Sequence, residues 1–160
     1  MRIRFIFSFL LITTVALVIN APLLALDDSS QLNNDTLVRQ FCDSLAADLV
    51  KADAAAIRLK MTNDFKEYYN PEQFTKRYYQ IAEMYGQVKE YNFKMVGTGV
   101  KMYFDGRKYP MKKIWYAVTT TKHKMGECFL FIEVIAEGSH LASSGFSFVM
   151  FTGDIPDNLK

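Results

Sequence analysis

The sequence predicts an α+β protein in which N-terminal helices pack on a curved antiparallel sheet of about four to six strands, preceded by a signal peptide. Three observations lead to this prediction. An apolar run opens the chain, apolar residues then recur at three- and four-residue steps as far as residue 85, and apolar and polar residues alternate from residue 91 onward. A block of helices followed by a block of hairpin-linked strands is typical of α+β proteins with an antiparallel sheet.

Residues 1–25 have the order of a secretory signal peptide. Arg2 and Arg4 give a positive start, an almost uninterrupted apolar run follows, and the first acidic residue is Asp27. Cleavage after Ala25 is predicted, which makes the protein exported, either periplasmic or extracellular. The same run is long enough to span a bilayer, so an uncleaved membrane anchor is the alternative.

The charge balance argues against nucleic-acid binding. The chain has 19 basic and 17 acidic residues, for a net charge of +2. Without Arg2 and Arg4 the two signs balance, and the remaining basic residues form only short clusters such as Lys112-Lys113. A nucleic-acid-binding protein concentrates its basic residues on one face. We therefore predict no nucleic-acid partner, and contact with a membrane only through an uncleaved N-terminal segment.

The rest of the chain predicts one domain. Residues 26–34 form a polar lead-in, residues 35–153 a single α+β domain and residues 154–160 a tail. Helical spacing of apolar residues begins at Val38, where Asn34 or Asp35 can cap the helix, and continues to Tyr68. A shift near Asp53 marks either a break between two helices or one long bent helix.

A further helix is predicted from Asn70 onward. The Asn70 side chain can accept hydrogen bonds from free N–H groups, and Pro71 suits the first helical position because its missing donor costs nothing there. Gly86 can supply a left-handed stop. The apolar stripe of this helix consists of Phe74, Tyr78, Ile81 and Tyr85.

The second half of the domain predicts strands. Apolar and polar residues alternate over residues 91–95, Gly97 and Gly99 indicate a bulge or bend, and Asp105-Gly106 is a preferred pair for a tight hairpin. The stretches "KIWYAVTTTK", "ECFLFIEVIAEG" and "HLASSGFSFVMF" predict three further strands. In the second of them Cys128, Leu130, Ile132 and Val134 share one face. Because this face lacks glutamate, it is predicted to point at the helices.

The two cysteines are a possible disulfide pair. Cys42 lies in the first helical stripe and Cys128 on the strand face that points at the helices, so the two sulfurs could meet across one core. Export to an oxidising compartment would favour the bridge. Two separate buried thiols are the alternative, because free cysteine packs as a small apolar residue. The sequence contains no CxxC pair or Cys/His cluster, so we predict no metal and no cofactor.

This order of elements resembles the nuclear-transport-factor-2-like, cystatin-like cone superfamily, and within it small exported bacterial domains of unknown function. The resemblance spans Leu37 to Phe151 and depends on "ADAAAIRLKMTNDFKEYYNPEQFTKRY", "YGQVKEYNF" and "IWYAVTTTK…GECFLFIEV…HLASSGFSF". It implies a cone with an apolar pocket between helices and sheet. It does not imply an activity, because the fold hosts isomerases, dehydratases, transport factors and parts of secretion machines.

Residues that could line or flank such a pocket are two aspartates and four tyrosines. Tyrosine brings an apolar body and a polar tip, which suits a ligand pocket as well as an interface or a packed core. No catalytic motif occurs, so no catalytic residue is assigned. The pocket candidates are Asp48, Asp53, Tyr68, Tyr78, Tyr85 and Tyr116.

A partner surface is predicted on the other face of the sheet. Phe129, Phe131 and Ile135 alternate there with glutamates, and apolar residues on a polar sheet face favour a dimer or partner contact. Members of the superfamily often pair through the sheet, so the resemblance implies a homodimer.

Together these features predict a non-enzymatic, exported binding or assembly module, which holds a small apolar ligand or docks on another envelope protein. One alternative is a small-pocket isomerase or lyase that uses an Asp and a Tyr inside the cone. Another is a membrane-anchored component of a secretion machine. Convergence of two of the residues Asp48, Asp53, Tyr78 and Tyr116 in one apolar cavity would favour the enzyme.

Overall fold

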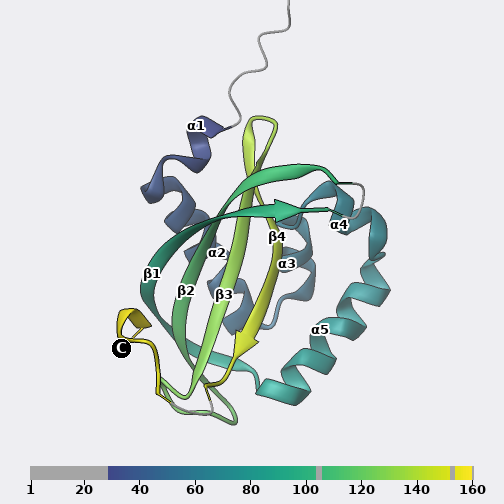
Figure 1. Ribbon diagram of the computed structural model, residues 1–160. Coiled ribbons are helices and arrows are strands. Elements are labelled where there is room, and N and C mark those ends of the chain that lie inside the picture. The colour runs from purple at the N-terminus through teal and green to yellow at the C-terminus, as the bar shows by residue number, and fades with distance from the viewer. Residues whose placement is uncertain (1–28, 104–105, 152–153, 160) are drawn as a thin grey trace, which may run out of the picture.

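The predicted α+β class with helices packed on an antiparallel sheet is confirmed: within the described residues, five helices precede a four-stranded antiparallel sheet (Figure 1). The computed structural model describes residues 29–103, 106–151 and 154–159, and the predicted signal peptide lies outside them. The helices are α1 (Ser29–Leu32), α2 (Asp35–Lys51), α3 (Ala54–Leu59), α4 (Asn63–Tyr68) and α5 (Pro71–Tyr85). The strands are β1 (Val88–Met102), β2 (Lys108–Thr120), β3 (Cys128–Glu137) and β4 (His140–Val149), followed by the short 3-10 helix η1 (Asp157–Leu159).

The helix boundaries follow from side chains that cap free backbone groups. Asn34 caps α2 by accepting a hydrogen bond from the Leu37 N–H, and Asp53 caps α3 in the same way. Between α2 and α3, Ala52 has a left-handed backbone with φ of 57°. The shift that the sequence places near Asp53 is therefore a break between two helices. The stripe expected to run on to Tyr68 breaks a second time, because Thr62 caps a separate helix α4.

Helix α5 begins and ends where the sequence predicts. Asn70 and Gln73 exchange hydrogen bonds in a capping box, and Pro71 occupies the first turn. Gly86 follows the helix with φ of 83° and ψ of 158°. This backbone has the predicted positive φ but is extended in ψ, so the chain passes directly into β1 instead of making a left-handed helical stop.

The strands form a meander in the order β1-β2-β3-β4, with every neighbouring pair antiparallel. A bulge or bend was predicted at Gly97 and Gly99, and no bulge lies there, because both glycines pair regularly with β2. The register of β1 shifts earlier, between Val88 and Glu90 and between Phe93 and Met95. A Cβ atom at Gly99 would lie 3.0 Å from the Met111 Cε, the end of a flexible side chain that could shift to make room. The strand bends strongly, and its C-terminal half crosses the sheet toward α4 (Figure 1).

The inner face of the sheet packs on the helices as predicted. Leu130 and Ile132 on β3 are fully buried, and they share one apolar core with Leu45 and Leu49 of α2. Packing of the apolar face of a helix against the sheet supplies most of the stability of helices of this length. The prediction that the face without glutamate points at the helices is therefore confirmed.

The outer edge of β4 is partly covered by the segment that links α3 to α4, which we call the 60–62 strap. The Thr62 N–H donates a 2.9 Å hydrogen bond to the Ser143 carbonyl, and the Ser143 N–H donates a 2.8 Å bond to the Lys60 carbonyl. The strap fixes the position of α4 beside β4. Further along, β4 faces α5 instead (Figure 1).

Two segments predicted to lie outside the domain pack on it. Leu32 of α1, in the predicted polar lead-in, is 3% exposed and belongs to the main core. Leu159 of η1, in the predicted tail, is 4% exposed and packs with Ala117 and Phe129 on the outer face of the sheet. In each segment a single leucine makes the contact, and one apolar residue gives no periodic pattern from which packing could be predicted.

Candidate functional site

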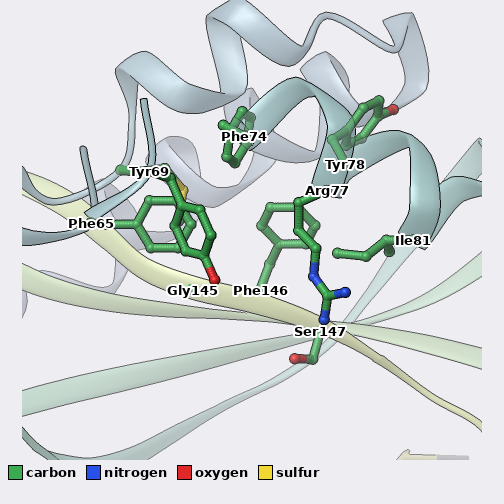
Figure 2. A pocket seen from close by; sticks show the side chains of 10 residues that line it. Phe65, Tyr69, Phe74, Arg77, Tyr78, Ile81, Gly145, Phe146 and Ser147 are labelled. Atoms are coloured by element: carbon green, nitrogen blue, oxygen red, sulfur yellow. The ribbon is translucent and has the colours of Figure 1, made fainter. Parts of the chain in front are cut away.

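A groove lined by aromatic and aliphatic side chains runs between α5 and β4, and we call it the α5–β4 groove. It consists of two adjoining cavities of about 200 Å³ and 310 Å³. The first is lined by Met61, Phe65, Tyr69, Phe74, Arg77, Tyr78, Ile81, Gly145, Phe146 and Ser147 (Figure 2). The second is lined by Arg77, Gln80, Ile81, Met84, Tyr85, Phe146, Ser147 and Phe148. Four residues line both cavities: Arg77, Ile81, Phe146 and Ser147.

Helical spacing on α5 builds one wall of the groove. Phe74 and Tyr78 are buried at 3% and 4% exposure, and Ile81 continues the same stripe one turn later. The opposite wall is β4, whose Phe146 and Phe148 face the helix. The groove stays open because β4 is an edge strand with no further strand beside it.

Helix α4 and the residue that follows it bound the first cavity of the groove. Phe65 packs edge to face on Phe74, with ring centres 5.8 Å apart, and the Phe65 and Tyr69 rings lie 5.0 Å apart. Arg58 holds the end of α4 in place, because its guanidinium donates hydrogen bonds to the carbonyls of Tyr69 and Lys66 at 3.0 and 2.8 Å. These contacts fix the aromatic side chains before any ligand arrives.

Arg77 is the charged residue of the groove. Its side chain extends from α5 toward Ser147 on β4, beside Ile81 (Figure 2). Among the described residues, no acidic side chain lines either cavity, and Arg77 forms no hydrogen bond or ion pair. The sequence analysis missed Arg77, although it lies three residues after Phe74 and four before Ile81, on the edge of the predicted stripe.

Two of the four predicted pocket tyrosines line the groove, and a third, Tyr68, does not. Tyr78 lines its first cavity and Tyr85 its second. The Tyr78 hydroxyl donates a 3.4 Å hydrogen bond to the Leu49 carbonyl, and burial raises the pKa of this hydroxyl. Tyr68 is 77% exposed and borders a separate depression of about 470 Å³ with Met102. Tyr78 and Tyr85 are thus placed together, and Tyr68 is not.

The two predicted aspartates do not reach the groove. Asp48 forms an ion pair with Lys60, and Asp53 caps α3 by accepting a 2.9 Å hydrogen bond from the Ala56 N–H. Both therefore stabilise the turn between α2 and α3. Of Asp48, Asp53, Tyr78 and Tyr116, only Tyr78 lines the groove, so the convergence of two of them that would favour an enzyme is not found there.

Tyr116 instead pairs with Asp43, a residue that the sequence analysis missed. The Tyr116 hydroxyl donates a 2.8 Å hydrogen bond to Asp43 Oδ1, and Tyr91 donates a 3.2 Å bond to the Asp43 carbonyl. Tyr116 is fully buried, and burial together with the nearby Cys42 and Asp43 raises the pKa of its hydroxyl. Arg39 contacts the same carboxylate at 3.6 Å. The pair ties β2 to α2, outside the groove.

The predicted disulfide between Cys42 and Cys128 is wrong, because both residues are free thiols. Both are fully buried in the main core, Cys42 beside Tyr116 and Cys128 opposite Val118, one inward-facing position further along β2. Burial raises the pKa of Cys128 to about 11 and that of Cys42 still further. The two thiols fill space as small apolar groups, the alternative that the sequence left open.

The residues predicted as an interface are largely covered within the chain. Phe129 is 1% exposed beneath the C-terminal segment, and Ile135 is 3% exposed. Phe131 is half-buried, with its ring 4.9 Å from that of Trp115 and the Lys113 ammonium 4.4 Å above it. The chain's own segments thus occupy much of this outer face.

The described part of the chain contains no group of three or more His, Cys, Asp or Glu residues that could hold a metal ion. No described helix is both long and apolar enough to cross a membrane. No protein-family model matches the chain, and no curated protein is similar to it.

Proposed function

We propose that this protein is a non-enzymatic binding module that holds a small apolar molecule in the α5–β4 groove. The observation that supports the proposal most is the lining, which is mostly aromatic or aliphatic and also includes the polar residues Arg77, Gln80 and Ser147. Binding sites for small molecules are concave and mostly apolar, with few polar groups that fix orientation. Phe65, Phe74 and Phe146 supply such a surface without help from another chain.

The same proposal includes two further statements: the protein is exported, and it is a member of the cone superfamily. Helices followed by an antiparallel meander are compatible with the resemblance, which is an analogy at the level of the fold. An exported module of this kind would carry its ligand, or present it to another envelope protein. N-terminal sequencing of the mature protein tests the export: a start after Ala25 supports it, and an intact Met1 favours the membrane-anchored alternative.

The enzymatic alternative depends on the pair Asp43 and Tyr116. An isomerase or lyase needs an acid or base that substrate can touch, in a site that shifts its pKa. Tyr116 is fully buried, and its hydroxyl is already used by Asp43. We therefore rank binding above catalysis.

A neutral fluorescent probe tests the proposal. N-Phenyl-1-naphthylamine becomes bright in apolar sites, so the wild-type protein should bind it saturably. Ile81→Trp fills the part of the groove that both cavities share and should weaken binding about tenfold, or ~1.4 kcal/mol. Leu59→Trp is the matched control, because Leu59 is 74% exposed on α3. Equal affinity of the two variants would overturn the proposal.

A further inference from the structure

One arginine of the described residues stands apart from the other three. Arg39 contacts Asp43, Arg58 donates to two backbone carbonyls, and Arg107 contacts Asp64 at 3.0 Å. Arg77 is the remaining arginine of the described residues, and it has no such partner there. It is also the arginine that lies where two apolar cavities meet.

The surroundings of Arg77 suit an anion. Residues three and four positions away on α5 are its helical neighbours, and they are Phe74, Gln73, Gln80 and Ile81, none of them acidic. On the facing strand the neighbour is Ser147, whose side chain points away from the groove (Figure 2), because Phe146 and Phe148 on either side of it face the helix. An anion bound here would meet the planar guanidinium fork of Arg77, with no carboxylate in the lining to repel it.

We propose that the ligand of the α5–β4 groove is an amphiphile with a single anionic head, such as a monocarboxylate with an aliphatic chain. This inference rests on the proposed function and names its ligand class. The apolar chain lies against Phe74 and Phe146, and the head group lies where the two cavities meet, so that the Arg77 guanidinium donates hydrogen bonds to it. An apolar cavity alone would not distinguish a carboxylate from an alcohol, whereas Arg77 does.

Decanoate and decanol test the head group separately from the chain. Both are titrated against bound N-phenyl-1-naphthylamine, and the affinity ratio of decanoate to decanol is measured. Arg77→Gln should lower this ratio about tenfold, because it removes a charge-assisted hydrogen bond and leaves the apolar lining intact. Arg77→Lys, which keeps the charge but loses the fork, should retain part of the ratio.

Lys76→Gln is the matched control, because Lys76 is an exposed cation on the same helix that does not line the groove. A ratio that is unchanged in Arg77→Gln, or that falls equally in Lys76→Gln, overturns the anionic head and leaves the proposed function standing. If neither ligand displaces the bound probe from the wild-type protein, the inference fails, whereas the proposed function is overturned only by the probe measurements on Ile81→Trp and Leu59→Trp. Binding to phosphatidylglycerol vesicles without binding to decanoate overturns the inference and assigns the groove to a membrane surface.

Discussion

Glu133 on β3 is a carboxylate held between two lysines on the outer face of the sheet. Its Oε2 accepts a 2.7 Å hydrogen bond from Lys101 of β1, and its Oε1 lies 3.4 Å from the Lys113 ammonium of β2. Burial alone would raise the pKa of Glu133, but the hydrogen bond and charge of Lys101 and the charge of Lys113 outweigh burial and hold this pKa below its usual value. The residue thereby joins the bent end of β1 to β3.

Glu133→Gln should therefore destabilise the protein in a pH-dependent way. A carboxylate with a lowered folded pKa contributes stability above its unfolded pKa of about 4.3, and that contribution is lost as pH falls through the folded pKa. Urea unfolding should show a loss of about 1–2 kcal/mol at pH 7 that shrinks below pH 4. Glu90→Gln is the control, because Glu90 is exposed on β1. A loss of the same size at both pH values would contradict this assignment.

For single residues, the sequence predicted which face of an element a side chain occupies better than which residue it contacts. It placed Tyr78 and Tyr116 near the core, because their spacing within one element shows which face they occupy. It could not predict that Tyr116 reaches Asp43, because that contact joins residues 73 positions apart. Cys42 and Cys128 share a core as predicted, but periodicity gives only the face and not the position along it.

The junction between α5 and β1 depends on a single glycine. Gly86 has φ of 83° and ψ of 158°, a combination that is essentially restricted to glycine. A Cβ atom at this position would lie 2.7 Å from Thr120 Oγ1 and 2.8 Å from the Lys122 backbone nitrogen. Close packing against the β2 end and an unusual backbone therefore coincide at the same residue.

Gly86→Ala should cost ~3 kcal/mol, from backbone strain together with overpacking. Gly126→Ala separates the two effects, because Gly126 also has positive φ, at 86°, but nothing lies within 4 Å of an added Cβ. It should cost ~1 kcal/mol. Thermal or urea unfolding of both variants checks the order, and a Gly126 variant as unstable as the Gly86 variant would show that the close contacts contribute nothing.

The elements themselves were predictable where their signals are local. Asn70 and Pro71 predict the start of α5. The apolar stripe of this helix predicts one wall of the groove. The separate helix α4 and the bulge after Phe93 were not predictable, because the first depends on the strap to Ser143 and the second on pairing with β2. Arg77 escaped notice for a related reason, since its importance comes from β4 and not from its own helix.

Viewed as a whole, the molecule covers its sheet on both sides. The helices lie on the inner face, and Phe151, Ile155 and Leu159 pack over Ala117 and Phe129 on the outer face. The homodimer predicted through this outer face would have to use what the C-terminal segment leaves uncovered. The C-terminal segment, with its single turn of 3-10 helix, is too short to show a periodic apolar pattern, so its packing on the sheet could not be predicted.

Leu159→Asp should release the C-terminal segment from the sheet. The change places a charge among apolar side chains and should cost about 2 kcal/mol in urea unfolding. Exposed Phe129 and Trp115 should then make the variant self-associate in sedimentation velocity, because exposed apolar patches favour contacts between molecules. Asp154→Asn, an exposed change in the same segment, should leave both measurements unaltered. A stable and unassociated Leu159 variant would show that the segment does not protect the face.

The 60–62 strap has a consequence for contacts between copies of the chain. At Ser143 the main-chain donor and acceptor on the margin of β4 are already taken by Lys60 and Thr62. Open sheet margins are where proteins recruit foreign strands and begin to grow into fibrils. A second molecule that tried to lengthen this sheet at Ser143 would first have to displace the chain's own backbone, so the link between α3 and α4 also guards against such growth.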